Sequence, residues 1–441
     1  MDRVLLLMTT ATYKASAFLD AAARLGAPVV VGSERPQALE KAAPGGTVAL
    51  DFSAPEDAVR TIVDFARQSP IRAVVSADDE GSILAVMASV ALGLPHNPVE
   101  AVAAARNKHR MREILAKTDI RSPRFERFSS DDDPEGAARM VSYPCVLKPL
   151  SLSASRGVIR ADDPDQFVAA FRRVRAILLQ SGISARGAAP QSAAAGAGQG
   201  QGSAARGVEA RGGAPARTIL VEAFIPGNEV ALEGLLTRGM LKVLAIFDKP
   251  DPLDGPFFEE TIYVTPSRLP ASTQDAVAAC TAHVAAALGL REGPVHAELR
   301  VNEKEPWIIE IAPRSIGGLC ARTLRFDSAS SRGVSLEELI LRHALGFEVE
   351  RFERERRAAG VMMIPIPRAG ILREVRGQER AREVPGVEEI RFTIPVGQQV
   401  VPPPEGAKYL GFIFARNDAP AAVEGALREA HGRLSFAITP P

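Results

Sequence analysis

Short apolar runs alternate with amphipathic stretches over roughly the first 95 residues of the chain. The apolar runs predict strands at 3–9, 28–33, 47–52 and 71–79. The amphipathic stretches predict helices at 14–26, 55–68 and 81–93. This alternation is typical of a parallel sheet with helices on its faces. The turn after the first strand, TTATYK, lacks the GxGxxG glycines, which argues against an NAD-dependent enzyme.

A second group of elements extends to about residue 180. Residues 97–120 have a helical pattern, with a break expected near Arg106–Asn107. A later helix is expected to open at Pro164, since proline suits the first turn of a helix. Between these helices, strands of a new sheet are expected at 124–128, 143–150 and 157–163.

Residues 181–217 differ from the rest of the chain. Of these 37 residues, 12 are Ala and 9 are Gly, among scattered Ser, Gln and Arg. Such a segment buries too little apolar surface to offset the entropy of ordering, so we expect a disordered insertion. The clear strand patterns on both sides favour an insertion within a domain; an interdomain linker is the alternative.

The strands expected after this segment are apolar or alternating, and mostly short turns connect them. They fall at 218–225, 228–236, 241–247, 259–266, 294–302 and 306–312. One helix, from about Ser272 to Leu290, lies among them, and another follows at 335–346. This order predicts a mainly antiparallel sheet that carries helices, which is an α+β arrangement.

Glu310 lies in the middle of the apolar strand sequence WIIEI. A lone carboxylate in such a strand is costly unless it is paired or binds a metal. The preceding strand, HAELR, holds Glu298, and a hairpin turning near 303–306 would set the two glutamates roughly opposite each other. Cross-strand neighbours lie about 5 Å apart, so two carboxylates there need a cation between them. Mg²⁺ together with phosphate oxygens suits such a pair.

Three further features could serve the phosphates of a nucleotide. Lys148 ends the strand VLKPL, and the loop SLSASRG (151–157) follows at once. The lysine offers a cation and the loop offers backbone N–H groups. Arg314, just after the WIIEI strand, could neutralise a transferring phosphoryl group. Each feature alone could be a surface charge or a plain loop, but their order along the chain is more specific than any one of them.

Composition argues against several other classes of protein. The 53 basic and 53 acidic residues balance, which gives no global argument for nucleic acid or a membrane surface as a partner. The cysteines Cys145, Cys280 and Cys320 form no metal-binding or disulfide pattern. No apolar run approaches the roughly 18 residues of a membrane span, and no signal-peptide cleavage pattern follows the N-terminus. We therefore expect a cytoplasmic protein without nucleic-acid or membrane partners.

In these residues the chain resembles the ATP-grasp superfamily of carboxylate–amine ligases, and in particular the bacterial L-amino-acid (dipeptide) ligases. The resemblance rests on ARNKHRMRE, VLKP, SLSASRG, VEAFIPGNEV, HAELR, IIEIAPR and FDKPDPLDGPFFEETIYVTPS. It implies an ATP-grasp fold built of α/β and α+β parts. These parts would be a Rossmann-like pre-grasp domain at 1–106, a small grasp lobe at 107–220 and a large lobe with the metal and substrate site at 221–350, and the resemblance covers roughly residues 1–350. The pattern of the remaining residues predicts a small C-terminal α+β domain at 351–441.

The resemblance also implies an ATP site. Lys108 and Lys148 would contact phosphates or adenine N7, and the loop 151–157 would cover the triphosphate. Residues 222–224 would hydrogen-bond adenine, and Glu229 would hold the ribose hydroxyls. The residues implied to bind ATP are therefore Lys108, Lys148, Ser153, Ser155, Gly157, Glu222, Ala223, Phe224 and Glu229.

The metal and substrate sites are implied in the same way. Glu298 and Glu310 would bind Mg²⁺, for which Mn²⁺ could substitute, and Arg314 would act in catalysis by binding the γ-phosphate and then the acyl phosphate. Many superfamily members carry Asn two residues after the second glutamate, where this chain has Ala312, so the number of metal ions stays open. Glu260 would hold the incoming ammonium group, and the SIGG turn is either a plain strand end or a place where backbone approaches the intermediate. The residues implied to bind substrate are Glu260, Ser315, Gly317 and Gly318.

The reaction implied by the resemblance is ATP-dependent amide formation. A carboxylate attacks the γ-phosphate of ATP, and an amine then attacks the resulting acyl phosphate, so that ADP and phosphate are released. The substrates would be small molecules, amino acids or another carboxylic acid with an amine, and the oligomer expected from the family is a homodimer. Two alternatives stay open, namely a carboxylase or formate-type ligase of the same fold, and a nucleotide-binding module without turnover.

Overall fold

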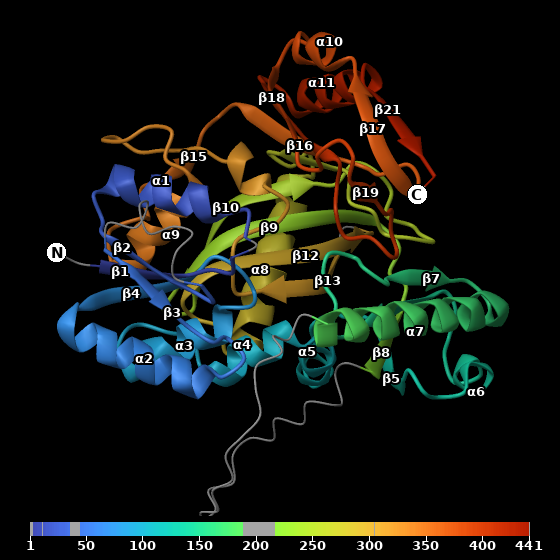
Figure 1. Cartoon of the computed structure of the whole chain (residues 1–441), viewed down its shortest axis with the longest axis horizontal. Helices are drawn as coiled ribbons and strands as arrows, with labels where there is room; N and C mark the ends of the chain where they lie inside the picture. The colour runs from blue at the N-terminus through green and yellow to red at the C-terminus, as the bar shows by residue number, and fades with distance from the viewer. Residues whose placement is uncertain (1–2, 11, 36–44, 188–216, 304, 441) are drawn as a thin grey trace, which may run out of the picture.

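The structure is a computed structural model that describes residues 3–10, 12–35, 45–187, 217–303 and 305–440. In Figure 1 the N-terminal part, in blue, and the green lobe that carries α7 (Pro164–Gly187) lie on opposite sides, and a large sheet lies between and above them. Most of the predicted insertion lies outside the described residues. Its first residues, 181–187, belong to α7, so the prediction of disorder is wrong there. Extending an existing helix adds one hydrogen bond for each residue fixed, which is far easier than nucleating a new helix.

Four strands near the N-terminus form a parallel sheet: β1 (Arg3–Leu7), β2 (Val29–Ser33), β3 (Thr47–Ala49) and β4 (Ile71–Ser76), in the order β3–β2–β1–β4. Three helices accompany them: α1 (Ala15–Leu25), α2 (Pro55–Gln68) and α3 (Ser82–Ala91). Adjacent residues of β1 serve opposite faces, since Leu6 packs in one cluster with Phe18 of α1 and Leu5 in another with Ile62 of α2. The predicted parallel sheet with helices on both faces is confirmed.

Two short helices follow the sheet: α4 (Val99–Arg106) and α5 (Lys108–Leu115). Asn107 between them has extended backbone, and its side chain accepts a hydrogen bond from the Arg110 N–H at 3.1 Å. An Asn in this position satisfies one of the free N–H groups that begin a helix. The predicted break is confirmed, and it places Lys108 on the first turn of α5.

The second lobe is built on an antiparallel sheet in the order β5–β8–β6–β7. Its elements are β5 (Phe125–Ser129), α6 (Pro134–Ala138), β6 (Cys145–Pro149), β7 (Ile159–Ala161), α7 and β8 (Thr218–Ala223). Phe167 and Phe171 of α7 pack against Phe128 of the sheet. We predicted that 218–225 belongs to the same sheet as the later strands. That prediction is wrong, because β8 pairs with β5 and β6. The pattern of a strand shows that it is buried but does not show its partner.

A single eight-stranded antiparallel sheet forms the largest part of the molecule, in the order β13–β12–β9–β10–β11–β16–β20–β18. Its strands are β9 (Asn228–Thr237), β10 (Met240–Asp248), β11 (Ile262–Thr265), β12 (Gly293–Asn302), β13 (Glu305–Ala312), β16 (Ala358–Ile364), β18 (Val387–Phe392) and β20 (Gly411–Asn417). The helix α8 (Ala271–Leu288) packs on it through Val277 and Val284. The last three strands in this order lie beyond residue 350, so one sheet holds strands from two of the proposed domains. The limits of those domains stay proposals.

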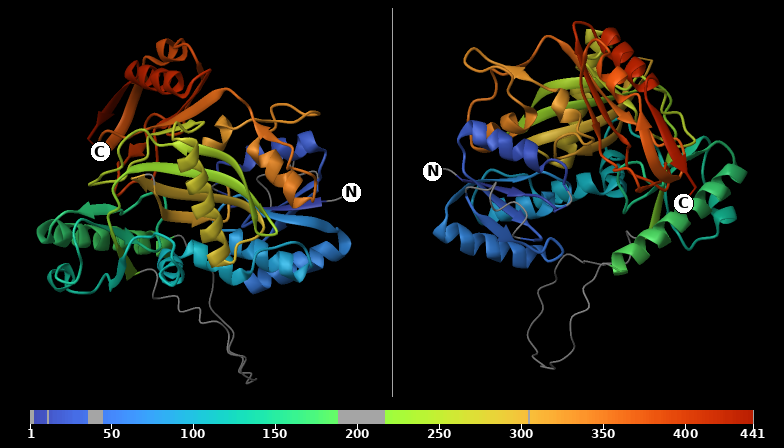
Figure 2. Two further views of the ribbon diagram at one scale, coloured as in Figure 1. Left: turned by 180° about the vertical axis from the view of Figure 1, so that it is seen from behind. Right: turned by 45° about the horizontal axis from the view of Figure 1, so that its top comes forward.

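Smaller elements complete the C-terminal part, where β17 (Gly370–Arg376), β19 (Gln399–Val400) and β21 (Ser435–Thr439) form a three-stranded sheet. The others are the short helix η3 (Cys320–Thr323), β14 (Phe326–Asp327), α9 (Leu336–Ala344), β15 (Glu353–Arg354), α10 (Gln378–Arg382) and α11 (Pro420–Gly432). Figure 2 shows the sheet of β17, β19 and β21 with α10 and α11, in orange to red, away from the N-terminal helices, whereas α9 packs against α1. In the described part of the chain, no helix has the length and apolarity of a membrane span.

Candidate active site

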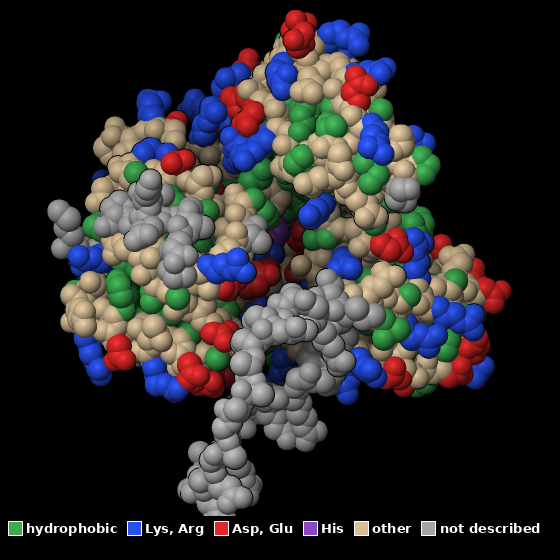
Figure 3. Space-filling view, in the orientation of Figure 1, with side chains coloured by type: hydrophobic (Ala, Val, Ile, Leu, Met, Phe, Trp, Pro, Cys, Tyr) green, Lys and Arg blue, Asp and Glu red, His purple; other side chains and the backbone are tan. Residues whose placement is uncertain are grey.

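A cavity of about 500 Å³ is lined by residues of the N-terminal sheet, the second lobe and the large sheet. Figure 3 shows a hollow in the middle of one face, with acidic and basic side chains and a histidine in its depth. The lining includes every site residue proposed from the sequence except Gly157 and Ser315. Segments that are far apart in the chain therefore converge on one space.

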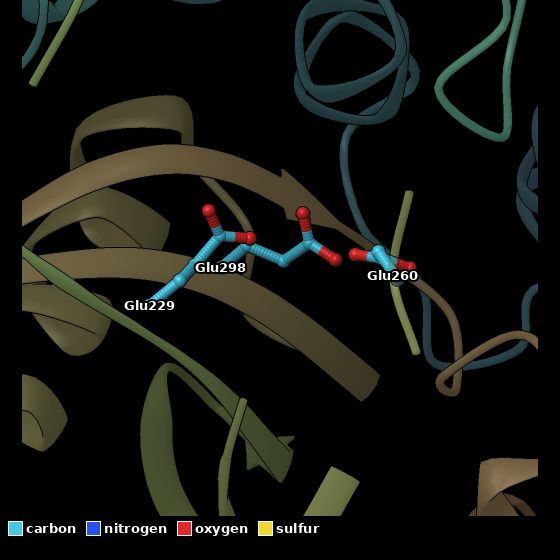
Figure 4. Close-up of side chains that lie close together, drawn as sticks. All are labelled: Glu229, Glu260 and Glu298. Carbon is cyan, nitrogen blue, oxygen red and sulfur yellow. The ribbon is translucent and has the colours of Figure 1, made fainter. Parts of the chain in front are cut away.

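Three carboxylates and one ammonium group meet in this cavity. Glu229 on β9, Glu298 on β12 and Glu260 just before β11 bring carboxylate oxygens within 4.8 Å of one another. Figure 4 shows the three side chains approaching each other. The Lys249 Nζ lies 2.7 Å from Glu229, 2.6 Å from Glu260 and 3.2 Å from Glu298. The lysine side chain is only 2 % exposed, so its charge neutralises the carboxylates inside the protein.

The charges of this cluster depend on one another. Burial would raise the pKa of Glu298, but Lys249 and His296 hold it well below its usual range. Burial would lower the pKa of Lys249, and the surrounding carboxylates raise it well above its usual range. His296 lies 2.8 Å from Glu233 and 3.4 Å from Glu298. Although burial lowers the pKa of His296, these two carboxylates raise it to about 9. The ligand-free cluster therefore holds an ionised Glu298 and a charged Lys249.

The two glutamates predicted to share a metal ion are direct partners in the β12–β13 ladder, as the hairpin predicted. The Lys108 Nζ lies 2.8 Å from the Glu310 carboxylate. Burial would lower the pKa of Lys108, and Glu310 outweighs it and raises that pKa. Carboxylate oxygens beside a phosphate site are the donors that Mg²⁺ prefers. Glu298 and Glu310 therefore fit a divalent cation, whereas Ala312 adds no donor atom to the site.

Glu222, proposed for adenine binding, holds two cations. Its carboxylate accepts a hydrogen bond from Arg112 Nε at 2.7 Å and another from Lys148 Nζ at 2.6 Å. Burial would raise the pKa of Glu222, but the two cations lower it to about 2. Arg112 also donates to the Ile309 carbonyl at 2.6 Å. Glu222 thus fixes Lys148 at the cavity and ties β8 to α5 and β13.

The serine-rich loop after β6 lines the cavity through Ser153 and Ser155. Ala154 and Ser155 have left-handed backbone, with φ of 54° and 55°. Non-glycine residues seldom adopt this conformation, and such residues gather at functional loops. Gly157 has a φ of 73°, and its N–H donates to the Pro404 carbonyl at 2.8 Å. The C-terminal part of the chain therefore contacts the loop predicted to cover the triphosphate.

Arg314 follows β13 and reaches the N-terminal sheet. Its Nε lies 2.8 Å from Asp79 Oδ2, and its Nη1 donates to the Ser315 carbonyl at 2.9 Å. Burial would lower the pKa of Arg314, and Asp79 outweighs it and raises that pKa. The Lys14 Nζ donates to the carbonyl and hydroxyl oxygens of Ser315, each at 3.2 Å. Residues of the N-terminal part thus hold the segment that follows the second glutamate.

The SIGG turn exposes backbone to the cavity. The Gly318 N–H donates to the Tyr13 hydroxyl at 2.8 Å. Gly318 has a φ of 61°, and a Cβ there would come within 3.0 Å of the Met363 sulfur. Glycine is therefore required at this position for both conformation and space. Burial raises the pKa of Tyr13 to about 12, so its hydroxyl keeps its proton.

Several residues at the site were missed from the sequence, among them Lys14, Asp79, Arg112 and Lys249. Lys249 directly follows an apolar strand, a signal of the same kind as Glu310 in WIIEI, and could have been found that way. Arg112 lies in an ordinary helical pattern, and nothing in its neighbours marks it as buried. Lys14 and Asp79 act across the domain junction, which no local pattern describes.

Three family models match this chain. They are the ATP-grasp N-terminal domain at residues 19–96, the ATP-grasp domain at 204–323, and the L-amino acid ligase C-terminal domain 2 at 362–439. The crystal structure of an L-amino acid ligase from Bacillus licheniformis aligns with a TM-score of 0.76 and 26 % identity, covering 100 % of this chain and 99 % of that one. The chain belongs to the ATP-grasp superfamily of carboxylate–amine ligases. The predicted fold and the predicted class of ADP-forming ligase are thereby confirmed.

Sequence relatives agree with this assignment. Dapdiamide A synthase of Enterobacter agglomerans is 25 % identical over 378 residues, which cover 84 % of this chain and 81 % of that protein. Alanine–anticapsin ligase of Bacillus subtilis (strain 168) is 26 % identical over 275 residues, which cover 59 % of this chain and 52 % of that protein. The match to the second relative thus spans about half of its length. An ATP-grasp ligase of this kind acts on small molecules with ATP and a divalent metal ion.

Proposed function

We propose that this ligase joins the carboxylate of one L-amino acid to the amine of another, forming a dipeptide through an acyl phosphate. ADP and phosphate would be the other products. The observation that supports this most is the cavity, where paired carboxylates and cations suited to Mg²⁺ and ATP adjoin Arg314 and the SIGG turn. The printed names of the relatives, dapdiamide A synthase and alanine–anticapsin ligase, support the same chemistry.

ATP would lie along the second lobe. The backbone carbonyls of Ala223 and Phe224 would accept hydrogen bonds from adenine, because their N–H groups already donate to the carbonyls of Arg124 and Pro144 and the Glu222 carboxylate is engaged by two cations. Lys148 and the loop that holds Ser153, Ser155 and Gly157 would bind the phosphates. Backbone N–H groups and a lysine together form a common phosphate site.

Glu229 would accept hydrogen bonds from the ribose hydroxyls. Its two oxygens already contact Lys249 and Arg300, at 2.7 and 3.1 Å. Each carboxylate oxygen has a second lone pair, so both can accept a further bond. The two cations would then hold the carboxylate in place for the ribose.

Glu298 and Glu310 would hold the divalent cation, for which we propose Mg²⁺ over Mn²⁺. When bound, the cation neutralises phosphate charge and so eases attack at the γ-phosphorus. Lys108 would then leave Glu310 and contact a phosphate oxygen. Lys249 would stay with the other carboxylates of the cluster.

The residues beyond β13 would act on the reacting groups. Arg314, oriented by Asp79, would neutralise the γ-phosphoryl group as a carboxylate oxygen attacks it, and would then hold the acyl phosphate. Gly317 and Gly318 would let the acyl group lie against backbone. Glu260, just before β11, would bind the incoming ammonium and take one proton from it, since burial raises the pKa of this carboxyl. The amine nitrogen would then attack the acyl carbon, phosphate would leave, and the second proton would pass to the departing phosphate. Positioning of this kind supplies most of the catalysis in phosphoryl transfer.

The test is release of ADP and phosphate from ATP and Mg²⁺ across single and paired L-amino acids. We expect release only with particular amino acids, and a fall of at least about 100-fold in Glu310→Gln. Glu305→Gln changes an exposed glutamate of the same strand and should leave the rate unchanged. ATP binding without release for any pair would refute the dipeptide proposal, and trials with bicarbonate and formate would then separate the carboxylase-type alternative from a module without turnover.

Two further expectations accompany this proposal. We propose that the ligase works in the cytoplasm and that it forms a homodimer. Gel filtration with light scattering would measure the oligomeric state directly, and a monomer across the working concentration range would refute the second expectation.

A further inference from the structure

Lys14 is a buried cation that the proposed reaction leaves without a role. It lies in the turn TTATYK that follows β1, lines the cavity, and is only 6 % exposed. Its Nζ contacts two neutral acceptors, the carbonyl and hydroxyl oxygens of Ser315, each at 3.2 Å. This ammonium group could therefore bind an anion that enters the cavity.

Four other cations of the cavity already have a negatively charged partner in the protein. In the described residues, Lys108, Lys148, Arg300 and Arg314 each have a carboxylate within 4.0 Å. Lys14 has none among the described residues. A buried charge without a counter-charge is costly, and the cost is recovered when an anion arrives.

The surroundings of Lys14 add to this cost. Burial, together with the nearby Arg314, lowers its pKa to about 8. Asp78, Glu233 and Asp79 act in the opposite direction, but none of them makes an ion pair with it. The ammonium group is thus mostly charged near neutral pH and is held ready for a ligand.

We propose that Lys14 binds the α-carboxylate of the acceptor amino acid, the one whose amine attacks the acyl phosphate. This inference rests on the proposed function. The donor carboxylate is consumed and must face the γ-phosphate near Arg314, whereas the acceptor carboxylate stays charged throughout the reaction. A permanent charge on a buried substrate group requires a cation of the protein, and Lys14 is the buried cation of the lining that no described carboxylate pairs with. Arg156 of the lining also has no ion pair among the described residues, but it is more exposed and donates to the Glu405 carbonyl.

A carboxylate suits this place better than a phosphate does. Two aspartates, Asp78 and Asp79, act on the Lys14 charge from nearby, and they would repel a group with two or three negative charges more than a group with one. The Tyr13 hydroxyl, which accepts from Gly318, keeps a proton that it can donate to a carboxylate oxygen. Lys14 and Tyr13, which contact Ser315 and Gly318 of one turn, thus offer two donors at the same part of the cavity.

The test compares the acceptor amino acid, once identified, with its α-amide in wild-type protein and in Lys14→Met. For the amino acid, we expect kcat/KM to fall by about 10- to 100-fold, the value of a charge-assisted hydrogen bond. For the amide, kcat/KM should change by less than about twofold, because the charge that Lys14 would bind is absent. Lys14→Arg should restore part of the loss, and Lys117→Met, which removes an exposed lysine, should change neither substrate.

A misfolded variant would lose activity toward both substrates equally. The ratio of the two losses in kcat/KM therefore reports the contact between Lys14 and the carboxylate. In a Lys14→Met protein whose circular dichroism matches that of wild type, equal losses for amino acid and amide, or no loss for either, would overturn the proposal. Calorimetric binding of the twenty L-amino acids, with a non-hydrolysable ATP analogue and Mg²⁺, gives a readout that needs no turnover. If amino acids bind in a way that depends on Lys14 but no turnover occurs, the proposed reaction is overturned and the carboxylate-binding role of Lys14 is supported. An absence of amino-acid binding to wild type would overturn both.

Discussion

The substitution Glu222→Gln tests how much the buried ion pairs contribute to this fold. Gln has the shape of Glu and the charge of its protonated form, so the variant measures the value of the negative charge alone. The folded protein holds the pKa of Glu222 at about 2 against an ordinary value of 4.5, because Arg112 and Lys148 outweigh the effect of burial. At 1.36 kcal/mol for each pKa unit, the charge stabilises the fold by about 3 kcal/mol.

The sign of this effect with pH follows from the lowered pKa. The stabilisation is fully present above the unfolded value of 4.5 and is lost as pH falls through the folded value of about 2. We therefore expect wild type to exceed Glu222→Gln in free energy of unfolding by about 3 kcal/mol near neutral pH. That difference should shrink in acid, because the wild-type carboxylate then gains the proton that the amide imitates.

The assay is urea unfolding, followed by the fluorescence of Trp307, the one tryptophan in the sequence, and by far-ultraviolet circular dichroism. Both probes are needed, since a chain of several sheets can unfold in more than one step. Glu126→Gln makes the same change at an exposed site on the neighbouring strand β5 and should alter stability by less than about 0.5 kcal/mol. A Glu222→Gln variant as stable as this control would show that the ion pairs only balance their own burial, and would refute the reasoning.

Two other substitutions test the site. Lys249→Met removes the cation between Glu229, Glu260 and Glu298, so the melting temperature should fall. Added Mg²⁺ should raise the melting temperature of this variant more than that of wild type. An equal rise in both proteins would contradict this. Asp79→Ala frees Arg314 from its 2.8 Å ion pair, so kcat should fall about tenfold or more with little change in KM for ATP, whereas Asp64→Ala on an exposed face of α2 should change neither. An unchanged kcat in Asp79→Ala would show that Arg314 needs no such partner.

Much of the fold could be predicted from the sequence because local patterns carry it. The break before Lys108 was visible as a polar interruption, and the Asn107 cap explains it. The pairing of Glu298 with Glu310 was predictable because a hairpin leaves few registers open. The partner of β8 was not predictable, since its burial pattern suits either sheet and 37 residues of low complexity separate it from the preceding pattern.

The site was harder to predict than the fold. Spacing along the chain places residues on one strand or one hairpin, and it found the two glutamates and Arg314. It could mark Lys249 as a charge at the end of an apolar strand, but it could not show that this lysine contacts three carboxylates from three different segments. It could not find Lys14 or Asp79, because their contacts with Ser315 and Arg314 join the N-terminal sheet to the end of β13. Such contacts depend on how separate sheets pack, which a local pattern does not record.

These contacts between distant segments of the chain nearly balance the charge of the ligand-free cavity. Lys108 pairs with Glu310, and Lys249, His296 and Arg300 together offset the charge of the cluster around Glu298, before any substrate arrives. Binding of ATP with a divalent cation is therefore an exchange, since Lys108 can turn to a phosphate only as the cation replaces it on Glu310. ATP and metal should then bind far better together than either does alone. Lys14 stands outside this exchange because no carboxylate of the described chain pairs with it, which is why we propose that its partner comes with the substrate.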